Sequence, residues 1–168
     1  MREIGQPYPR LPLPETSQAE DLDAFQDWLQ QAIPLVAHLG LKRMTWQGDT
    51  LVWYLSLAPN LNDKGSGFGG SLAAQTTLIG WCWTTLWLRG QGRAQDVVVA
   101  SAEQRYLAPV TGDYRLECRP ATADAVDGLQ ARLAERGKGR LPLVQRLSVG
   151  DTCCLEAQGD YAILPLRD

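Results

Sequence analysis

The 168-residue sequence contains a single histidine, His38, and four cysteines, of which no two form a Cys-x-x-Cys pair. Zinc sites in proteins are usually built from histidines and spaced cysteine pairs, so this scarcity excludes the common kinds of zinc site. A histidine-based catalytic triad would have to use His38, which we interpret as a surface or capping residue. We therefore predict no metal, no bound cofactor, and cysteines that remain reduced thiols.

An excess of positive charge is also missing, because the net charge is -3 at pH 7 with histidine neutral. Proteins that bind phosphate backbones usually carry the opposite balance, so nucleic acid is not an expected partner. Residues 1–7 hold no apolar run of the kind that a secretory signal contains. Together with the reduced thiols, this predicts a cytoplasmic protein.

Proline is concentrated in residues 1–16, at Pro7, Pro9, Pro12 and Pro14, and this segment lacks periodicity. We predict an extended arm outside the core. The remaining residues 17–168 are predicted to form one domain. With 45% apolar residues, a chain of this length buries a core without disulfides or a structural metal.

Apolar residues recur at helical spacing at Leu22, Phe25, Leu29 and Ile33, which predicts an N-terminal helix that ends before Pro34. Ser17 and Glu20 have the spacing of a capping box at its start. Period-two alternation and turn residues predict strands elsewhere. These strands are expected at 39–46, 50–57, 96–107, 114–119, 141–149 and 152–164, with a short helical insertion at 124–136.

Charged residues are absent between Ser66 and Leu88, where we predict a long helix over residues 71–88. An uncharged stretch of this length can span a membrane. Polar residues such as Gln75 and Thr84, and the interruption at Gly80, favour a buried helix in the centre of a soluble fold instead. A helix that is apolar on all sides needs a sheet curled around it, so we predict an α+β architecture with no membrane contact.

Two motifs resemble those of the hotdog-fold acyl-CoA thioesterase superfamily. Residues 62–71 (NDKGSGFGGS) resemble the loop that opens the central helix there, whose common pattern is Asn, a Gly, then His-Gly-Gly. Residues 105–110 (RYLAPV), followed by Gly112-Asp113, resemble a strand and turn typical of the same superfamily. Phe68 in place of the histidine is similar to one thioesterase-like domain family, which occurs alone or fused behind a GNAT-type acetyltransferase.

This resemblance covers residues 33–165 and implies an antiparallel sheet wrapped around one central helix. It implies an acyl thioester substrate, carried on coenzyme A or on acyl carrier protein, so that coenzyme A is part of the substrate. It also implies a homodimer with acyl sites at the subunit interface, and the strand at 97–107 as the partner surface. A pair of such dimers is a further possibility.

Thioester hydrolysis needs a polarised carbonyl, an activated water and a slot for the acyl chain. The backbone amides of Gly69, Gly70 and Ser71 are expected in the first helical turn, where N–H groups lack internal partners and the dipole favours negative charge. They could therefore stabilise an oxyanion. The alternative is that Gly69 and Gly70 only let the helix start close to the sheet.

Activation of water has several candidate residues. Many hotdog thioesterases have a carboxylate nine residues after the histidine, but that position is Thr77 here, and the helix has no carboxylate. The remaining candidates are Asn62, Asp63 and, from a partner strand, Glu103. Alternatively, Asn62 and Asp63 are turn formers and Glu103 is a solvated strand residue.

Arg89 and Arg93 are candidates to bind the phosphates of coenzyme A, although scattered basic residues are usually solvated. We interpret the helix tryptophans as core or dimer packing, with one of them a candidate to line the acyl slot. The leading hypothesis is a thioesterase that acts by water attack. The alternatives are a non-catalytic acyl or coenzyme-A binding module, a hotdog dehydratase, which usually relies on a catalytic histidine, and a dimerisation domain without ligand.

Overall fold

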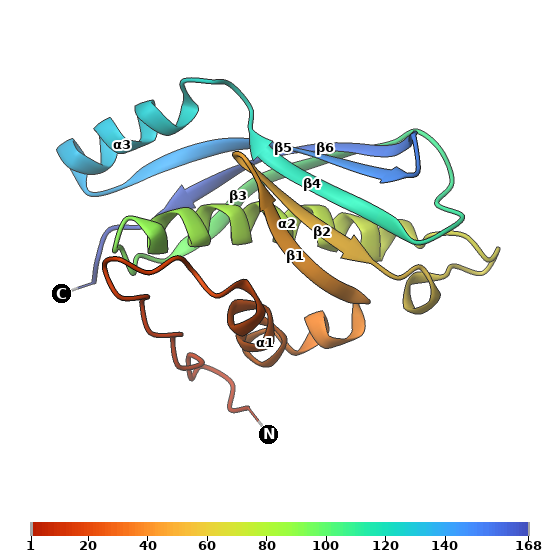
Figure 1. Ribbon diagram of the computed structural model, residues 1–168, viewed down its shortest axis with the longest axis horizontal. Helices are drawn as coiled ribbons and strands as arrows, with labels where there is room; N and C mark the ends of the chain where they lie inside the picture. Colours follow the sequence, from red (N-terminus) through yellow and green to blue (C-terminus); the bar gives the residue numbers. More distant parts are fainter. Residues whose placement is uncertain (1, 168) are drawn as a thin grey trace.

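The computed structural model describes residues 2–167 and has an antiparallel sheet with a long helix along one face (Figure 1). The strands lie in the order β1-β2-β4-β5-β6-β3. Their bounds are β1 Leu41–Gln47, β2 Thr50–Leu55, β3 Val97–Tyr106, β4 Tyr114–Pro120, β5 Gly139–Val149 and β6 Thr152–Ile163. The helices are α1 Leu22–Ala32, α2 Gly69–Gly90 and α3 Ala125–Arg136, with short 3-10 helices η1 Pro34–His38 and η2 Ala58–Asn60. The predicted α+β hotdog architecture is confirmed.

Helix α2 is the long central helix, and it begins two residues earlier and ends two residues later than predicted. Its buried side chains lie on more than one face, since Thr84 and Leu88 are buried as well as the stripe of Leu72 and Ile79. The indole N–H of Trp83 donates to the backbone oxygen of Asp49 (2.8 Å), which ties α2 to the β1–β2 turn. Among residues 2–167, no helix combines the length and the apolarity that crossing a membrane requires.

Helix α1 begins later than the predicted capping box implies. The carboxylate of Asp21 caps it, accepting from the backbone N–H of Ala24 (3.0 Å). The proposed pair of Ser17 and Glu20 is therefore wrong, because Asp21 offers a closer cap and the carboxylate of Glu20 binds elsewhere. Ile33 takes an extended conformation after the last turn, as the following proline requires.

Strand β3 forms one edge of the sheet, with β6 as its single neighbour among the described strands. Nine of its ten residues are exposed or half-buried, including Val98 and Val99. A bulge between Val99 and Ser101 shifts its register against β6. A long, partly apolar edge of this kind can still pair with another strand beyond the bulge.

Candidate active site

A buried polar network fixes the loop that precedes α2. Asn60 is 2% exposed and donates through Nδ2 to the backbone oxygen of Leu39 (2.8 Å). Its Oδ1 accepts from Nε2 of Gln75 on α2 (3.0 Å), and its backbone oxygen accepts from the N–H of Phe68 (2.7 Å). Because the two side-chain bonds of Asn60 are buried, the loop is held in one position against the helix start.

Tyr114 on β4 completes this network, since its hydroxyl donates to Oε1 of Gln75 (2.7 Å). Burial raises the pKa of Tyr114 to about 12, so the phenol is protonated and available as a donor near neutral pH. The network was missed in the sequence. The available signals were Gln75 within an uncharged helix and an asparagine just before the glycine-rich loop, because a buried polar group requires a partner.

The first turn of α2 presents free backbone amides. The N–H groups of Gly69, Gly70 and Ser71 have no backbone acceptor among the contacts of residues 2–167, as expected for a helix N-terminus. Gly70 is exposed and Ser71 half-buried, so the amides are accessible. The Ser71 hydroxyl donates to the backbone oxygen of Phe68 (3.1 Å), which stabilises the turn. These amides and the helix dipole favour an anionic oxygen here.

Aromatic rings lie beside both glycines at the start of the helix, and one of them explains Gly70. A Cβ at Gly70 would stand 2.5 Å from the Phe68 ring, and one at Gly69 would stand 3.4 Å from the ring of Tyr106. The hydroxyl of Tyr106 donates to the backbone oxygen of Gly69 (2.7 Å). Gly70 therefore leaves room for the Phe68 ring, whereas the 3.4 Å at Gly69 is an ordinary van der Waals contact. At Gly70, the glycine thus does more than let the helix approach the sheet.

An apolar groove of about 510 Å³ runs between α2, η1 and β3. Its lining is almost entirely apolar, with Gln104 and Thr77 as the polar side chains. From α2 come Ala73, Ala74, Thr77, Leu78 and Trp81, from β3 come Val99, Ala102 and Gln104, and from the segment around η1 come Ile33, Leu35, Val36 and Leu39. The groove begins one turn after the free amides and provides a slot for an apolar chain.

Comparison with known proteins shows to which family this chain belongs. A family model described as "Putative thioesterase (yiiD_Cterm)", or YiiD_C, matches residues 22–165. The chain belongs to the YiiD_C family. The predicted family resemblance is thereby confirmed.

Solved structures share the fold of this YiiD_C chain. A protein of unknown function from Chlorobaculum tepidum aligns with a TM-score of 0.77 and 25% identity, over 86% of this chain and 94% of its own. A "putative thioesterase" from Shewanella oneidensis aligns with a TM-score of 0.73 and 26% identity, over 86% and 97% of the two chains. A thioesterase from Haemophilus influenzae, at 15% identity and a TM-score of 0.71 over 90% and 95%, shows the fold alone.

In this YiiD_C chain, Asn62 closes its own loop. Its Oδ1 accepts from the backbone N–H groups of Lys64 (2.9 Å) and Ser66 (3.0 Å), and its Nδ2 donates to the hydroxyl of Ser66 (3.0 Å) and the backbone oxygen of Gly67 (3.3 Å). These bonds use both the oxygen and the nitrogen of the Asn62 side-chain amide. The prediction that Asn62 orients water or a carbonyl is replaced by the alternative, in which it forms the turn.

Asp63 does not lie in a closed cleft. Its side chain is 78% exposed and pairs with Nζ of the neighbouring Lys64 (2.9 Å), whose side chain is 77% exposed. The expected role as a base rested on partial enclosure, which the loop does not provide. Solvent screens an exposed pair of this kind, so it adds little to the fold.

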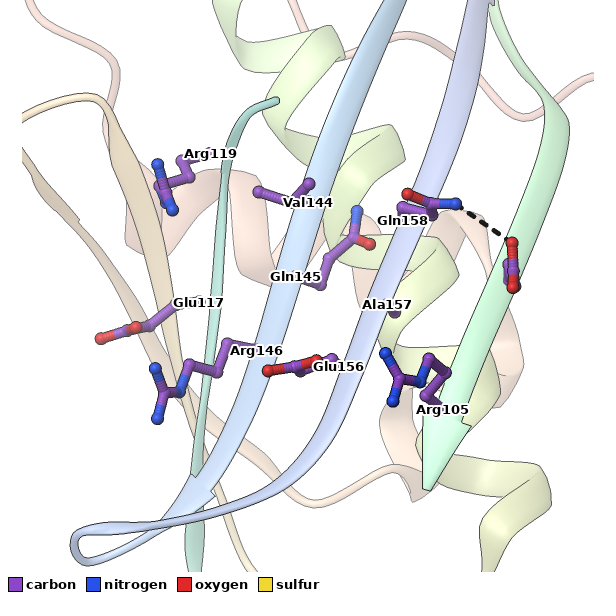
Figure 2. A pocket seen from close by; sticks show the side chains of 10 residues that line it. Arg105, Glu117, Arg119, Val144, Gln145, Arg146, Glu156, Ala157 and Gln158 are labelled. Carbon is purple, nitrogen blue, oxygen red and sulfur yellow. Dashed lines mark hydrogen bonds between the residues drawn. The ribbon is translucent and has the colours of Figure 1, made fainter. Parts of the chain in front are cut away.

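Glu103 lies on the face of the sheet opposite to α2. It accepts from Nε2 of Gln158 (3.0 Å), and both residues line a charged cavity on that outer face. Figure 2 shows this cavity, with Gln158, Glu156 and Arg105 among the labelled side chains that line it. A partner added to the β3 edge would extend the same sheet, so its Glu103 would face outward as well. Glu103 of this chain therefore does not line the groove, and a catalytic role for it from a partner strand stays a prediction. Its neighbour Gln104 is the residue that points into the groove, with Nε2 3.5 Å from the hydroxyl of Thr76.

Arg89 is buried near the end of α2 and binds the N-terminal arm. Its Nε and Nη2 donate to the two carboxylate oxygens of Glu20 (2.8 and 2.9 Å). Its Nη1 and Nη2 donate to the backbone oxygens of Leu11 and Pro12 (2.8 Å each). Because these bonds use the donors of the guanidinium, the prediction that Arg89 binds a phosphate is corrected. Arg89 instead holds the N-terminal arm against the end of α2. Arg93 contacts Gln95 (3.1 Å) and lies beyond the same helix end, about 30 Å from the free amides at 1.5 Å per residue.

No charged side chain lines the groove among the described residues. Within residues 2–167, no three His, Cys, Asp or Glu side chains gather as a metal site. The polar groups of the groove and of its opening are neutral: the hydroxyls of Ser71, Thr77 and Tyr106 and the amide of Gln104. This arrangement can bind a polarised carbonyl beside an apolar chain, and it provides hydrogen bonds for water without a titrating carboxylate.

Proposed function

We propose that this protein hydrolyses an acyl thioester of coenzyme A or of acyl carrier protein by attack of water. The thioester oxygen would accept hydrogen bonds from the amides of Gly70 and Ser71. The observation that carries the proposal is the position of these accessible amides, one helical turn from the start of the apolar groove. Membership of a family described as a thioesterase family supports it.

The amides would act on the transition state. Negative charge develops on the thioester oxygen as water attacks, and a donor aimed at that oxygen is typically worth about 3–4 kcal/mol, or a rate factor of about 100 to 1,000. The groove would hold the acyl chain and fix the carbonyl at the helix start. We assign the orientation of the attacking water to neutral groups beside the groove, Gln104 and the hydroxyl of Tyr106.

We further propose a homodimer formed through the exposed β3 edge. The strand has unpaired backbone groups along ten residues, and its apolar side chains Val98 and Val99 are exposed. Pairing with a second copy would extend the sheet and cover one side of the groove, because Val99 and Ala102 belong to both the edge and the groove lining. The pairing of two dimers remains a prediction.

A second candidate is an acyl or coenzyme-A binding module without catalysis. The neutral opening of the groove favours it, since hydrolysis at neutral pH usually uses a titrating base. Both candidates predict binding of acyl-CoA, and they differ in the release of thiol.

The test offers the purified protein a panel of acyl-CoA and acyl carrier thioesters from 2 to 18 carbons and measures free thiol. Turnover above the spontaneous rate for at least one chain length is expected. Absence of turnover across the whole panel would overturn the hydrolase. If calorimetry then still detects binding of acyl-CoA, the binding module remains as the candidate. Absence of both turnover and binding would exclude the two candidates.

A further inference from the structure

The apolar groove runs along α2. The side chains that α2 contributes are Ala73 and Ala74, then Thr77 and Leu78, then Trp81, so they repeat at intervals of four residues. Residues at this spacing form one stripe along a helix. The groove therefore runs parallel to α2, away from the free amides and toward Trp81.

A second cavity, of about 450 Å³, lies beyond Trp81 under the N-terminal arm. Its lining includes Pro12 of the arm, Trp28 of α1 and Thr85 of α2. Among residues 2–167, two side chains line both this arm cavity and the groove, Ile33 and Trp81. These two residues therefore form the partition between the cavities, and Trp81 is the larger one.

Trp81 is held in place from two sides. Its indole N–H donates to the backbone oxygen of Val97 at the start of β3 (2.8 Å). Its ring stacks on Trp28, with centroids 6.4 Å apart and planes 14° apart. Trp28 is in turn fixed by a bond from its indole N–H to the backbone oxygen of Pro9 (2.9 Å). Both the N–H and the ring of Trp81 therefore have partners that hold the indole between the two cavities.

The distance to Trp81 limits the chain. Gly70 and Trp81 are eleven residues apart on α2, which corresponds to about 16 Å along the helix axis. An extended alkyl chain advances by about 1.3 Å per carbon, since a single C–C bond measures about 1.5 Å. A chain whose carbonyl lies at the free amides therefore reaches Trp81 after about 10 to 12 carbons.

We propose that Trp81 ends the acyl slot and restricts this protein to short and medium acyl chains, with the arm cavity behind it closed to substrate. The proposal rests on the proposed function in that it takes the groove as the acyl slot. Replacement of the indole by a methyl group would join the two cavities and admit a chain of 16 carbons.

The experiment measures binding without turnover. Non-hydrolysable alkyl-CoA thioethers of 4 to 16 carbons are titrated by calorimetry into the wild type, Trp81→Phe and Trp81→Ala. Each buried methylene should raise the wild-type affinity about fourfold up to 10 to 12 carbons. The 16-carbon thioether should bind the wild type at least tenfold more weakly than this optimum. Trp81→Ala should recover that loss, and Trp81→Phe should lie between.

Trp87→Ala is the matched control, because Trp87 is another half-buried indole of α2 that lines a different cavity, beside Trp46 and Trp83. It should keep the wild-type chain-length profile. If folded Trp81→Ala keeps that profile too, or if the wild type binds the 16-carbon ligand at its optimum, the inference is wrong.

A further variant covers the case in which Trp81→Ala does not fold. Ala74→Leu fills the groove near the amides and should shift the optimum to chains shorter by several carbons, whereas an unchanged optimum would contradict the inference. A shifted binding profile without thiol release would overturn the hydrolase and keep the role of Trp81. Thiol release together with an unshifted binding profile would support the hydrolase and contradict the role of Trp81. A wild type that binds no thioether would contradict both the proposed function and the role of Trp81.

Discussion

The phenol of Tyr161 crosses the central helix at Gly80, in the space that a side chain at this position would fill. Tyr161 is fully buried, and its hydroxyl donates to the backbone oxygen of Thr77 (2.8 Å). Burial raises the pKa of Tyr161 well above its ordinary value, so the hydroxyl remains a donor over the whole working pH range. This contact fixes β6 on α2 midway along the groove.

Gly80→Ala should destabilise the protein, although alanine normally favours a helix by about 1 kcal/mol over glycine. The added methyl meets the Tyr161 ring and its hydroxyl. We expect a net loss of about 2 kcal/mol or more in the free energy of unfolding, measured in urea. Gly90→Ala is the control, since nothing lies within 4 Å of its added Cβ. Equal stability of the two variants would contradict the packing account.

Gly70→Pro should abolish hydrolysis, because it deletes one of the amides assigned to the oxyanion. Proline is tolerated in the first turn of a helix, so the fold should persist. We expect kcat to fall at least 100-fold. Gly70→Ala keeps the amide and requires only that the exposed ring of Phe68 move aside, so its kcat should stay within tenfold of the wild type. Similar losses in both variants would argue against the amide.

Arg89→Ala should release the N-terminal arm. The side chains of Arg89 and Glu20 are only 9% and 14% exposed, and removal of one partner leaves a buried charge unpaired. Such a loss typically costs about 3–5 kcal/mol of stability. Urea unfolding should show this loss, and limited proteolysis should cut residues 2–16 faster than in the wild type. The KM for acyl-CoA should not change, whereas a rise would restore the phosphate role.

Asp113 should contribute to acid stability. Its carboxylate accepts from Nζ of Lys42 (2.7 Å) and from the backbone N–H of Leu57 (2.9 Å), and these bonds lower its pKa. The folded state therefore favours the ionised form. This contribution is present above the unfolded pKa of about 3.9 and is lost as the pH falls through the lower, folded pKa. Unfolding of Asp113→Asn should show a shallower decline in stability between pH 5 and pH 2.

The pH dependence of hydrolysis should reflect the neutral groove. Without a carboxylate base at the site, kcat/KM should rise steadily from pH 6 to pH 9 with hydroxide concentration. An acid limb with a midpoint between pH 4 and 6, followed by a plateau, would instead indicate a titrating carboxylate. The measurement uses initial rates at one chain length, corrected for spontaneous hydrolysis at each pH.

The sequence was most informative where the pattern is local. Lack of charge predicted α2, because burial on all sides acts directly on residue choice. Alternation predicted β2 as a strand, although Val52 on its second face is also buried. The face of Glu103 was not predictable in this way. A bulge between Val99 and Ser101 interrupts the alternation of side chains along β3. A shift of one residue in this alternation decides whether Glu103 or Gln104 faces the groove.

The role of Arg89 was hidden for another reason. Its partners Glu20, Leu11 and Pro12 precede it by 69 to 78 residues, and no local pattern records that the arm returns to the end of α2. The capping of α1 was misjudged for the same reason, since Glu20 matches a capping box by spacing but serves the long-range ion pair.

The place of β3 beside β6 also shapes how the chain folds. β3 leaves the ribosome before β4, α3 and β5, yet its one partner in the sheet is β6, which follows all three. During that interval the three successive valines at 97–99 have no strand to pair with. Closure of such non-local pairs is slow, because loop entropy is lost before the contacts form. The nascent chain is therefore most exposed to aggregation between the emergence of these two strands.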